Sequence, residues 1–222
     1  MKRELEHFRI GSSYGGNQDW FPTYMMRIGG CGAQTACDSS VYFALHCGLK
    51  ALAPANAASL TQQDYVRFAY EMEPYLAPRM SGIDRLEFFM DGYAAFLRDR
   101  GETRISMTPL PGEAPYAAAR SAVIAQIDRG LPIPTLILRH RDRAFADYVW
   151  HWFLINGYDD ADRGFFVKAV TYGEQQWLDL RTLWNTGHKK RGGFVLFRLE
   201  NPGCPELPSC DDAWPGAAGD PT

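Results

Sequence analysis

The chain has 222 residues, of which 46% are hydrophobic and 14% aromatic, so a single domain with a sizeable core is expected. The net charge of -3 gives no electrostatic basis for binding nucleic acid or an anionic membrane surface. No apolar run approaches the roughly 18 residues of a membrane span, and the charged N-terminus lacks the apolar centre of a signal peptide. We expect a cytoplasmic protein with one domain over residues 1–200 and a disordered or loosely attached tail over 201–222.

The cysteine pattern argues against both a disulfide framework and a metal site. The chain has five cysteines, an odd number: Cys31, Cys37, Cys47, Cys204 and Cys210. No Cys-x-x-Cys pair or His-x-x-x-His pair accompanies them, so no metal and no cofactor are expected. Cys37 and Cys47 are interpreted as packing residues, and Cys204 and Cys210 are close enough in sequence to pair by proximity.

Residues 8–28 contain several glycine and proline breakers and are expected to be irregular to strand-like. Within them, Asn17–Phe21 places aromatic side chains beside amide side chains. Gln18 has two interpretations. In the first it satisfies the local backbone of a surface turn, and in the second its amide donates a hydrogen bond to an oxyanion.

A glycine turn, Gly29–Gly30, precedes Cys31 and a helix expected over residues 33–51. The sulfur would lie at the positive end of that helix, where orphan backbone N–H groups and the macrodipole favour a thiolate. Such a position can lower a thiol pKa from roughly 8.5 to about 3.5–7.5. Cys31 is therefore a candidate nucleophile, the alternative being a small buried residue at a helix start.

Further helices follow from apolar spacing and from turn residues. They are expected over 62–76, 83–100 and 115–129. Thr61 is the expected N-cap of the first of these, with Asp64 completing a variant of the capping box. A break is expected from Pro78 to Gly82.

The second half of the chain has the short apolar runs of strands. Strands are expected over 105–109, 132–140, 148–157, 165–171, 173–178 and 194–199, with a turn over 158–164 and a helical turn over 179–185. His188–Arg191 is interpreted as a solvated charge run. Helices first and an antiparallel sheet afterwards indicate the α+β class.

His151 lies at the start of the expected 148–157 strand, between Trp150 and Trp152. A hydrogen-bonded core histidine is one interpretation. The other pairs His151 with Cys31 as base and nucleophile, far apart in sequence and adjacent in space. The aromatic residues around both candidates line a cleft or belong to the core, and at least two are expected in the core: Trp20, Phe21, Trp150 and Trp152.

These motifs resemble a known family. Gly30–Ala36 resembles the nucleophile turn of papain-like cysteine peptidases, and it is closer to the bacterial branch of bacteriocin-leader (double-glycine) peptidase-like proteins. His151, with Gly157–Tyr158 after it, resembles the histidine strand of both groups. Thr171–Gly173 followed by Trp177 looks like the Ser-Trp-Gly element that follows the histidine strand in papain.

The resemblance covers roughly residues 15–200 and implies a papain-like fold, in which the nucleophile helix packs on a C-terminal antiparallel sheet. It implies that the Cys31 thiolate attacks a carbonyl carbon and that His151 protonates the leaving group. The Cys31 backbone N–H and a glutamine side chain, here Gln18, would hold the oxyanion, a contribution of about 10²–10³ in rate per donor. The acyl-enzyme is then hydrolysed.

The chain departs from the family at two positions. Met25 occupies the place about six residues before the cysteine where the family has its oxyanion glutamine, and the nearest upstream glutamine is Gln18. Residues 167–170 lack the family's Asp or Asn, which orients the histidine. Thr171, a backbone carbonyl or an Asp from elsewhere is left to orient His151, a role worth about 10⁴ in comparable triads.

Three functions fit these observations. The first is a cysteine peptidase or amidase acting on a peptide or amide substrate. The second is a catalytically impaired papain-fold protein that binds a peptide or small molecule in the same cleft, favoured by the missing Asp or Asn. The third is acyl transfer by the same two residues, as in transglutaminase-like enzymes. The sequence does not indicate the substrate or the oligomeric state.

Overall fold

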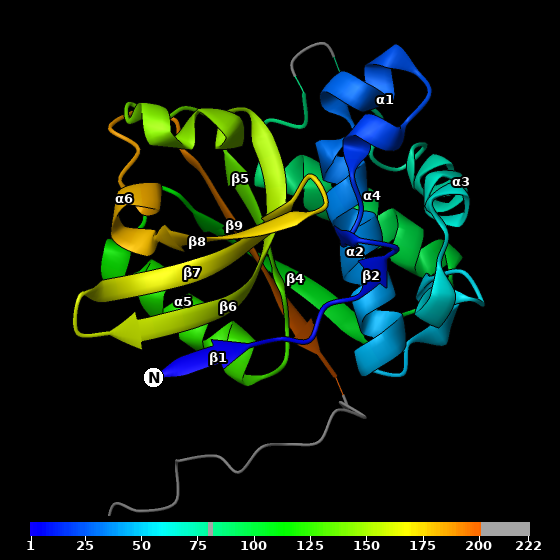
Figure 1. Ribbon diagram of the computed structural model, residues 1–222, viewed down its shortest axis with the longest axis horizontal. Helices are drawn as coiled ribbons and strands as arrows, with labels where there is room; N and C mark the ends of the chain where they lie inside the picture. Colours follow the sequence, from blue (N-terminus) through cyan, green and yellow to red (C-terminus); the bar gives the residue numbers. More distant parts are fainter. Residues whose placement is uncertain (80–81, 201–222) are drawn as a thin grey trace, which may run out of the picture.

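The computed structural model describes residues 1–79 and 82–200, so the expected tail and the pairing of Cys204 with Cys210 lie outside the described residues. A large antiparallel sheet lies beside a group of helices, which confirms the α+β class (Figure 1). None of the described helices is long and apolar enough to cross a membrane.

The main sheet has seven strands in the order β4-β9-β5-β6-β7-β8, with β1 paired to β6. Every pairing in it is antiparallel. Its strands are β1 (Lys2–Glu4), β4 (Ile105–Pro111), β5 (Ile133–Ile137), β6 (His151–Ala161), β7 (Gly164–Thr171), β8 (Glu174–Asp179) and β9 (Gly192–Leu199). Strands β2 (Arg9–Ile10) and β3 (Ser13–Tyr14) form a separate small hairpin.

Helix α2 packs against β6 on one side and α3 on the other, whereas α4 contacts β4 and β9 directly. Helix α5 is drawn behind the sheet (Figure 1). The α-helices are α1 (Tyr24–Gly29), α2 (Cys31–His46), α3 (Gln62–Met72), α4 (Leu86–Asp99), α5 (Tyr116–Asp128) and α6 (Leu180–Trp184). The short 3-10 helices are η1 (Gln18–Trp20), η2 (Lys50–Leu52), η3 (Ala57–Ser59) and η4 (Arg143–Tyr148). Almost the whole length of α2 is buried, which explains its small side chains.

The structure corrects the expected start and end of the first long helix. Helix α1 occupies part of the 8–28 stretch that was expected to be irregular to strand-like, and α2 follows it after Gly30 alone. Helix α2 also ends at His46 instead of continuing to 51. Gly48 adopts φ +71°, and the Leu49 N–H bonds back to the Phe43 carbonyl at 3.1 Å, so a left-handed glycine terminates the helix.

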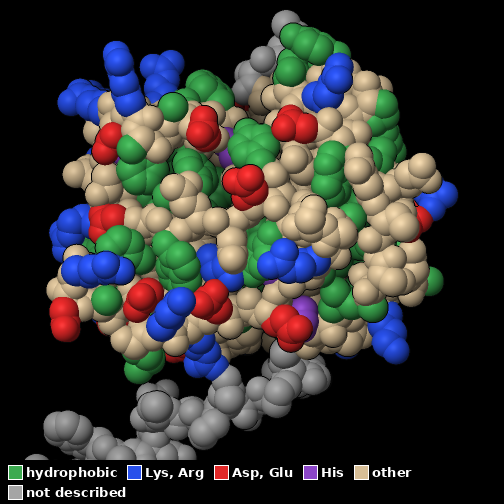
Figure 2. All heavy atoms as spheres, in the orientation of Figure 1, with side chains coloured by type: hydrophobic (Ala, Val, Ile, Leu, Met, Phe, Trp, Pro, Cys, Tyr) green, Lys and Arg blue, Asp and Glu red, His purple; other side chains and the backbone are tan. Residues whose placement is uncertain are grey.

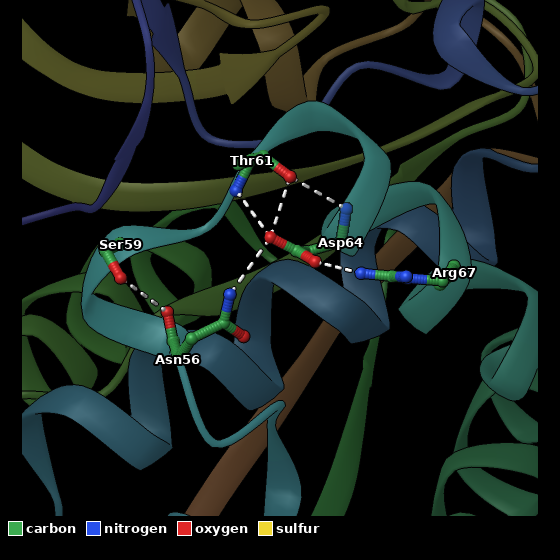
Figure 3. Close-up of polar contacts among 5 residues, drawn as sticks. All are labelled: Asn56, Ser59, Thr61, Asp64 and Arg67. Atoms are coloured by element: carbon green, nitrogen blue, oxygen red, sulfur yellow. Dashed lines mark hydrogen bonds and ion pairs between the residues drawn. The ribbon is translucent and has the colours of Figure 1, made fainter.

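The capping box predicted for Thr61 is confirmed at the start of α3 (Figure 3). The Thr61 hydroxyl accepts from the Asp64 N–H at 3.2 Å, and the Asp64 carboxylate accepts from the Thr61 N–H at 3.0 Å. Asn56 and Arg67 donate to the same carboxylate. The Thr61 hydroxyl also donates to this carboxylate at 2.7 Å. These hydrogen bonds, above all the one from the Thr61 hydroxyl, hold the pKa of Asp64 well below its usual value.

Strand β6 is longer than expected, because residues 158–161 belong to it and not to a turn. Strand β1, which the sequence analysis missed, pairs with this second half of β6, as in the register Lys2↔Asp159. The connection to β7 shrinks to Asp162 and Arg163. A three-residue charged strand has no apolar alternation of its own, so its position depends on the partner strand.

The four aromatics considered for a cleft divide between core and surface. Phe21 and Trp152 are almost fully buried, whereas Trp20 is half-buried and Trp150 is 47% exposed. Trp152 stacks on Phe89 of α4 and donates its indole N–H to the Ile83 carbonyl at 2.7 Å. Cys37 and Cys47 are buried, as expected for packing residues.

Candidate active site

Cys31 is the first residue of α2, and a single glycine connects that helix to α1. A Cβ at Gly30 would lie 2.3 Å from the Met26 carbonyl oxygen and 3.1 Å from the Phe21 ring. Only glycine allows this close approach, which fixes the point at which α2 begins. The sequence pattern therefore located the cysteine correctly, at the N-terminus of a buried helix.

Burial dominates the electrostatics of the Cys31 thiol. The side chain is 7% exposed, and desolvation raises its pKa above the ordinary value. Nearby backbone N–H groups of Trp152, Gly32 and Cys31 itself act in the opposite direction and lower that pKa. The lowered pKa expected from the helix N-terminus is wrong for this resting structure, because desolvation outweighs those donors.

The imidazole of His151 has hydroxyl groups as its hydrogen-bonding partners. Its Nε2 lies 2.6 Å from Oγ1 of Thr171. Its Nδ1 lies 3.4 Å from the hydroxyl of Tyr172, whose ring stacks on the imidazole with centroids 4.6 Å apart. Among the described residues, no hydrogen bond joins the Cys31 thiol to this imidazole. Of the alternatives open for the orienting group, the structure has Thr171.

The segments that carry Cys31 and His151 adjoin, since α2 packs against β6, although no hydrogen bond is found between the two side chains in the described part of the chain. The backbone N–H that faces the Cys31 sulfur is that of Trp152, the residue after His151. A Cβ on Gly32, the residue after Cys31, would lie 3.7 Å from the Trp152 ring. The start of β6 and the start of α2 therefore meet with the two candidate residues on adjoining segments.

The backbone on both sides of the imidazole is strained. Within residues 1–79 and 82–200, the non-glycine residues with positive φ are Trp150 at 55° and Tyr172 at 52°. Trp150 directly precedes His151, and Tyr172 follows its hydrogen-bonding partner Thr171. A bulky aromatic in the left-handed region costs about 1–3 kcal/mol, and such residues cluster at functional sites.

The resting site holds a neutral thiol and a neutral imidazole. Burial lowers the pKa of His151 from 6.5 to about 4. Within the described residues neither ring nitrogen is hydrogen-bonded to a carboxylate that would offset that desolvation, since the partners are the Thr171 and Tyr172 hydroxyls. Both shifts favour the uncharged form of each side chain at neutral pH.

Gln18 is held close to the first turn of α2. Its backbone N–H donates to Oε1 of Gln34 at 3.1 Å. Its side-chain Nε2 donates to the Arg27 carbonyl at 2.9 Å, which leaves a second N–H on that nitrogen, and its Oε1 is buried without a partner. The amide therefore satisfies local backbone, as the first interpretation expects, and the oxyanion role of its second N–H stays a prediction.

Two polar side chains of α2, which the sequence analysis did not single out, hold the loop that carries Gln18. Gln34 donates to the Gly16 carbonyl at 2.9 Å, and Asp38 accepts from the Gly16 N–H at 3.1 Å and from the Tyr65 hydroxyl at 2.5 Å. Burial raises the pKa of Asp38 to about 7. Their four-residue spacing on a helix of small apolar residues was the available signal, because it places both on one face.

Thr171→Val is expected to lower kcat for peptide hydrolysis by about 10–100-fold with a smaller change in KM, because the imidazole loses the group that fixes its tautomer. Thr171→Ser keeps the hydroxyl and is expected to retain activity within about threefold. Steady-state kinetics of both variants test this. Equal kcat values for the valine and serine variants would show that the Thr171 hydroxyl does not orient His151.

No protein-family model matches the chain, and comparisons with curated proteins and with solved structures find no match either.

Proposed function

We propose that the protein is a cysteine peptidase or amidase with a papain-like fold, which hydrolyses a peptide or amide bond through Cys31 and His151. The observation that carries the proposal is the meeting of the α2 N-terminus with the start of β6, where the Trp152 N–H faces the Cys31 sulfur. A thiol at a helix N-terminus beside an oriented imidazole is what nucleophilic catalysis by cysteine requires. The strained backbone on both sides of His151 adds support.

The reaction starts from the neutral pair. As the Cys31 sulfur bonds to the carbonyl carbon, its proton passes to Nδ1 of His151, whose contact with the Tyr172 hydroxyl has to give way as substrate enters. The C–N bond then breaks, and the leaving amine takes the proton from the imidazolium. Water attacks the resulting thioester and gives its proton to the imidazole, the C–S bond breaks, and the proton returns to the sulfur.

Stabilisation of the oxyanion is assigned to donors around the first turn of α2. The N–H groups at a helix start have no intrahelical partner, so those of Cys31 and Gly32 are available. The second N–H of the Gln18 amide is the remaining donor, since the first is bound to the Arg27 carbonyl. Each such donor contributes about 10²–10³ in rate when it is preorganised.

A second candidate is a binding protein that uses the same site without chemistry. The raised pKa of Cys31, the lowered pKa of His151 and the missing hydrogen bond between them favour it. It leaves the strained aromatics beside the imidazole and the thiol at the helix start without a role. We therefore place it second.

The proposal is tested by incubating the protein with a mixed-sequence peptide library and detecting new termini by mass spectrometry. Hydrolysis by the wild type and its absence in Cys31→Ser supports a cysteine peptidase. Products joined to an added primary amine would instead indicate acyl transfer. Peptide binding without any product, at protein concentrations that saturate the library, would support the binding protein and overturn the hydrolase.

A further inference from the structure

A cavity of about 440 Å³ is lined in part by Trp150, the residue that directly precedes His151. Its lining residues are Leu138, Arg139, Trp150, His188, Lys189 and Lys190. Two chain segments connect it to the candidate active site, because Trp150 precedes His151 and Leu138 follows Ile137, the residue paired with His151 across β5 and β6. The lining residues Leu138 and Trp150 therefore lie one residue beyond the paired ends of β5 and β6.

The loop that supplies the lysines is fixed to the same strand end. The Leu138 N–H donates to the Arg191 carbonyl at 3.1 Å, and the Arg141 N–H donates to the Thr186 carbonyl at 2.9 Å. On the opposite side, the Lys190 ammonium binds the Asp84 carboxylate at 2.7 Å. Ile83, the residue before Asp84, lies so close to Gly32 that a Cβ on that glycine would meet its side chain. The side of the cavity on which Lys190 binds Asp84 therefore reaches the first turn of α2.

The cavity lining is cationic although the chain as a whole carries a net charge of -3. Lys190 is neutralised by Asp84, but within the described part of the chain Arg139 and Lys189 have no ion-pair partner among the salt bridges. Figure 2 shows Lys and Arg side chains gathered at the upper left of the face of the molecule that it draws. The run His188–Arg191, interpreted from sequence as a solvated charge run, therefore lines a cavity with at least two uncompensated cations.

Trp150 gives the cavity an apolar wall. Of the tryptophans in residues 1–79 and 82–200 it is the most exposed, at 47%, and its backbone is held at φ 55°. Core packing does not require that conformation, because the side chain is not in the core. A strained backbone that holds an indole at the rim of a cationic cavity suits a ligand with an apolar part next to a negative charge.

We infer that this cavity is the specificity subsite of the proposed peptidase and that it binds a carboxylate of an acidic peptide next to the scissile bond. Arg139 and Lys189 bind the carboxylate, and Trp150 packs on the apolar chain beside it. That the bound peptide is a substrate rests on the proposed function, but the binding of acidic peptides does not require hydrolysis. The carboxylate is supplied either by a Glu or Asp side chain or by a free peptide C-terminus.

The test measures binding to Cys31→Ser protein by fluorescence anisotropy of labelled hexapeptides. Each peptide pair differs only by Glu or Gln at one position, and each is made with a free or an amidated C-terminus. We expect at least one Glu peptide, or the free C-terminus, to bind about tenfold more tightly than its neutral partner at about 50 mM salt. A preference that follows the side chain identifies an internal acidic residue, and one that follows the terminus identifies a terminal carboxylate.

Two charge-matched double variants make the test specific. Arg139→Gln with Lys189→Gln is expected to reduce the preference to within about twofold. Lys50→Gln with Arg129→Gln removes two other exposed cations, outside the cavity lining, and is expected to leave the preference unchanged. Equal binding of all charged and neutral pairs, or an equal loss in both double variants, would overturn the inference.

The outcome is separable from that of the proposed function. Charge-selective binding without hydrolysis by the wild type would leave the cavity as a binding site and remove the peptidase. Hydrolysis of charged and neutral peptides at equal rates, with equal binding, would keep the peptidase and remove the subsite.

Discussion

Replacing Cys31 with alanine is expected to abolish peptide hydrolysis, with kcat/KM falling by about 10³-fold or more. The sulfur forms the covalent bond to the acyl group, and no other nucleophilic side chain was assigned to the site. The fold is expected to survive, because the side chain is small and lies at the N-terminal end of α2. Measured kcat/KM on the peptide that the wild type cleaves best, together with the melting temperature, tests this prediction.

Cys37→Ala is the matched control. Cys37 is a fully buried cysteine further along the same helix, outside the site. Its replacement removes packing and is expected to cost about 1–2 kcal/mol of unfolding free energy while kcat/KM is unchanged. If Cys31→Ala kept wild-type activity, or if both variants lost it to the same extent, Cys31 would not be the nucleophile.

Among the substitutions proposed for this protein, Gly30→Ala is expected to cause the largest loss of unfolding free energy, about 2–4 kcal/mol. The melting temperature is expected to fall by about 5–15 °C. The added Cβ would lie 2.3 Å from the Met26 carbonyl oxygen, which is backbone and cannot rotate away. The joint between α1 and α2 has to open, and Cys31 moves with it. Calorimetry and the alkylation rate of Cys31 in the variant measure both effects.

Gly29→Ala is the control for the adjacent position. Its Cβ would lie 3.1 Å from Cβ of Pro78 and near no other side chain, so a small shift relieves the contact. We expect a change below about 1 kcal/mol. Equal destabilisation by the two alanines would mean that the close approach at Gly30 does not fix the start of α2.

Local rules in the sequence predicted the features that depend on local chemistry. Thr61 and Asp64 form their capping box because each partner lies within one turn of the other. Cys31 lies at a helix N-terminus because the flanking glycines and the small residues after it specify that geometry. The antiparallel pairing of the second half followed from short connections between apolar runs.

Features that depend on distant partners were beyond the sequence. Helix α1 is short and half-exposed, so its apolar spacing covers too few residues to distinguish it from a loop. The burial that raises the pKa of Cys31 comes from tertiary packing around the helix start, whereas a sequence shows only the helix terminus. The left-handed conformations of Trp150 and Tyr172 run against their residue types and gave no local signal.

The central claim, that Cys31 and His151 act as one reacting pair, is tested most directly by the pH dependence of Cys31 alkylation. Iodoacetamide is reacted with the wild type and with His151→Gln, which keeps most of the side-chain volume, and the Cys31 adduct is quantified by peptide mapping. Cys37 and Cys47 are buried and serve as internal controls.

Because His151 is neutral above its lowered pKa of about 4, it can accept the thiol proton throughout the neutral range. We predict that at about pH 7 Cys31 reacts at least about tenfold faster in the wild type than in His151→Gln. The advantage should disappear as the pH falls through about 4, where the imidazole becomes protonated. Equal rates in the two proteins at neutral pH would contradict the pair and with it the proposed chemistry.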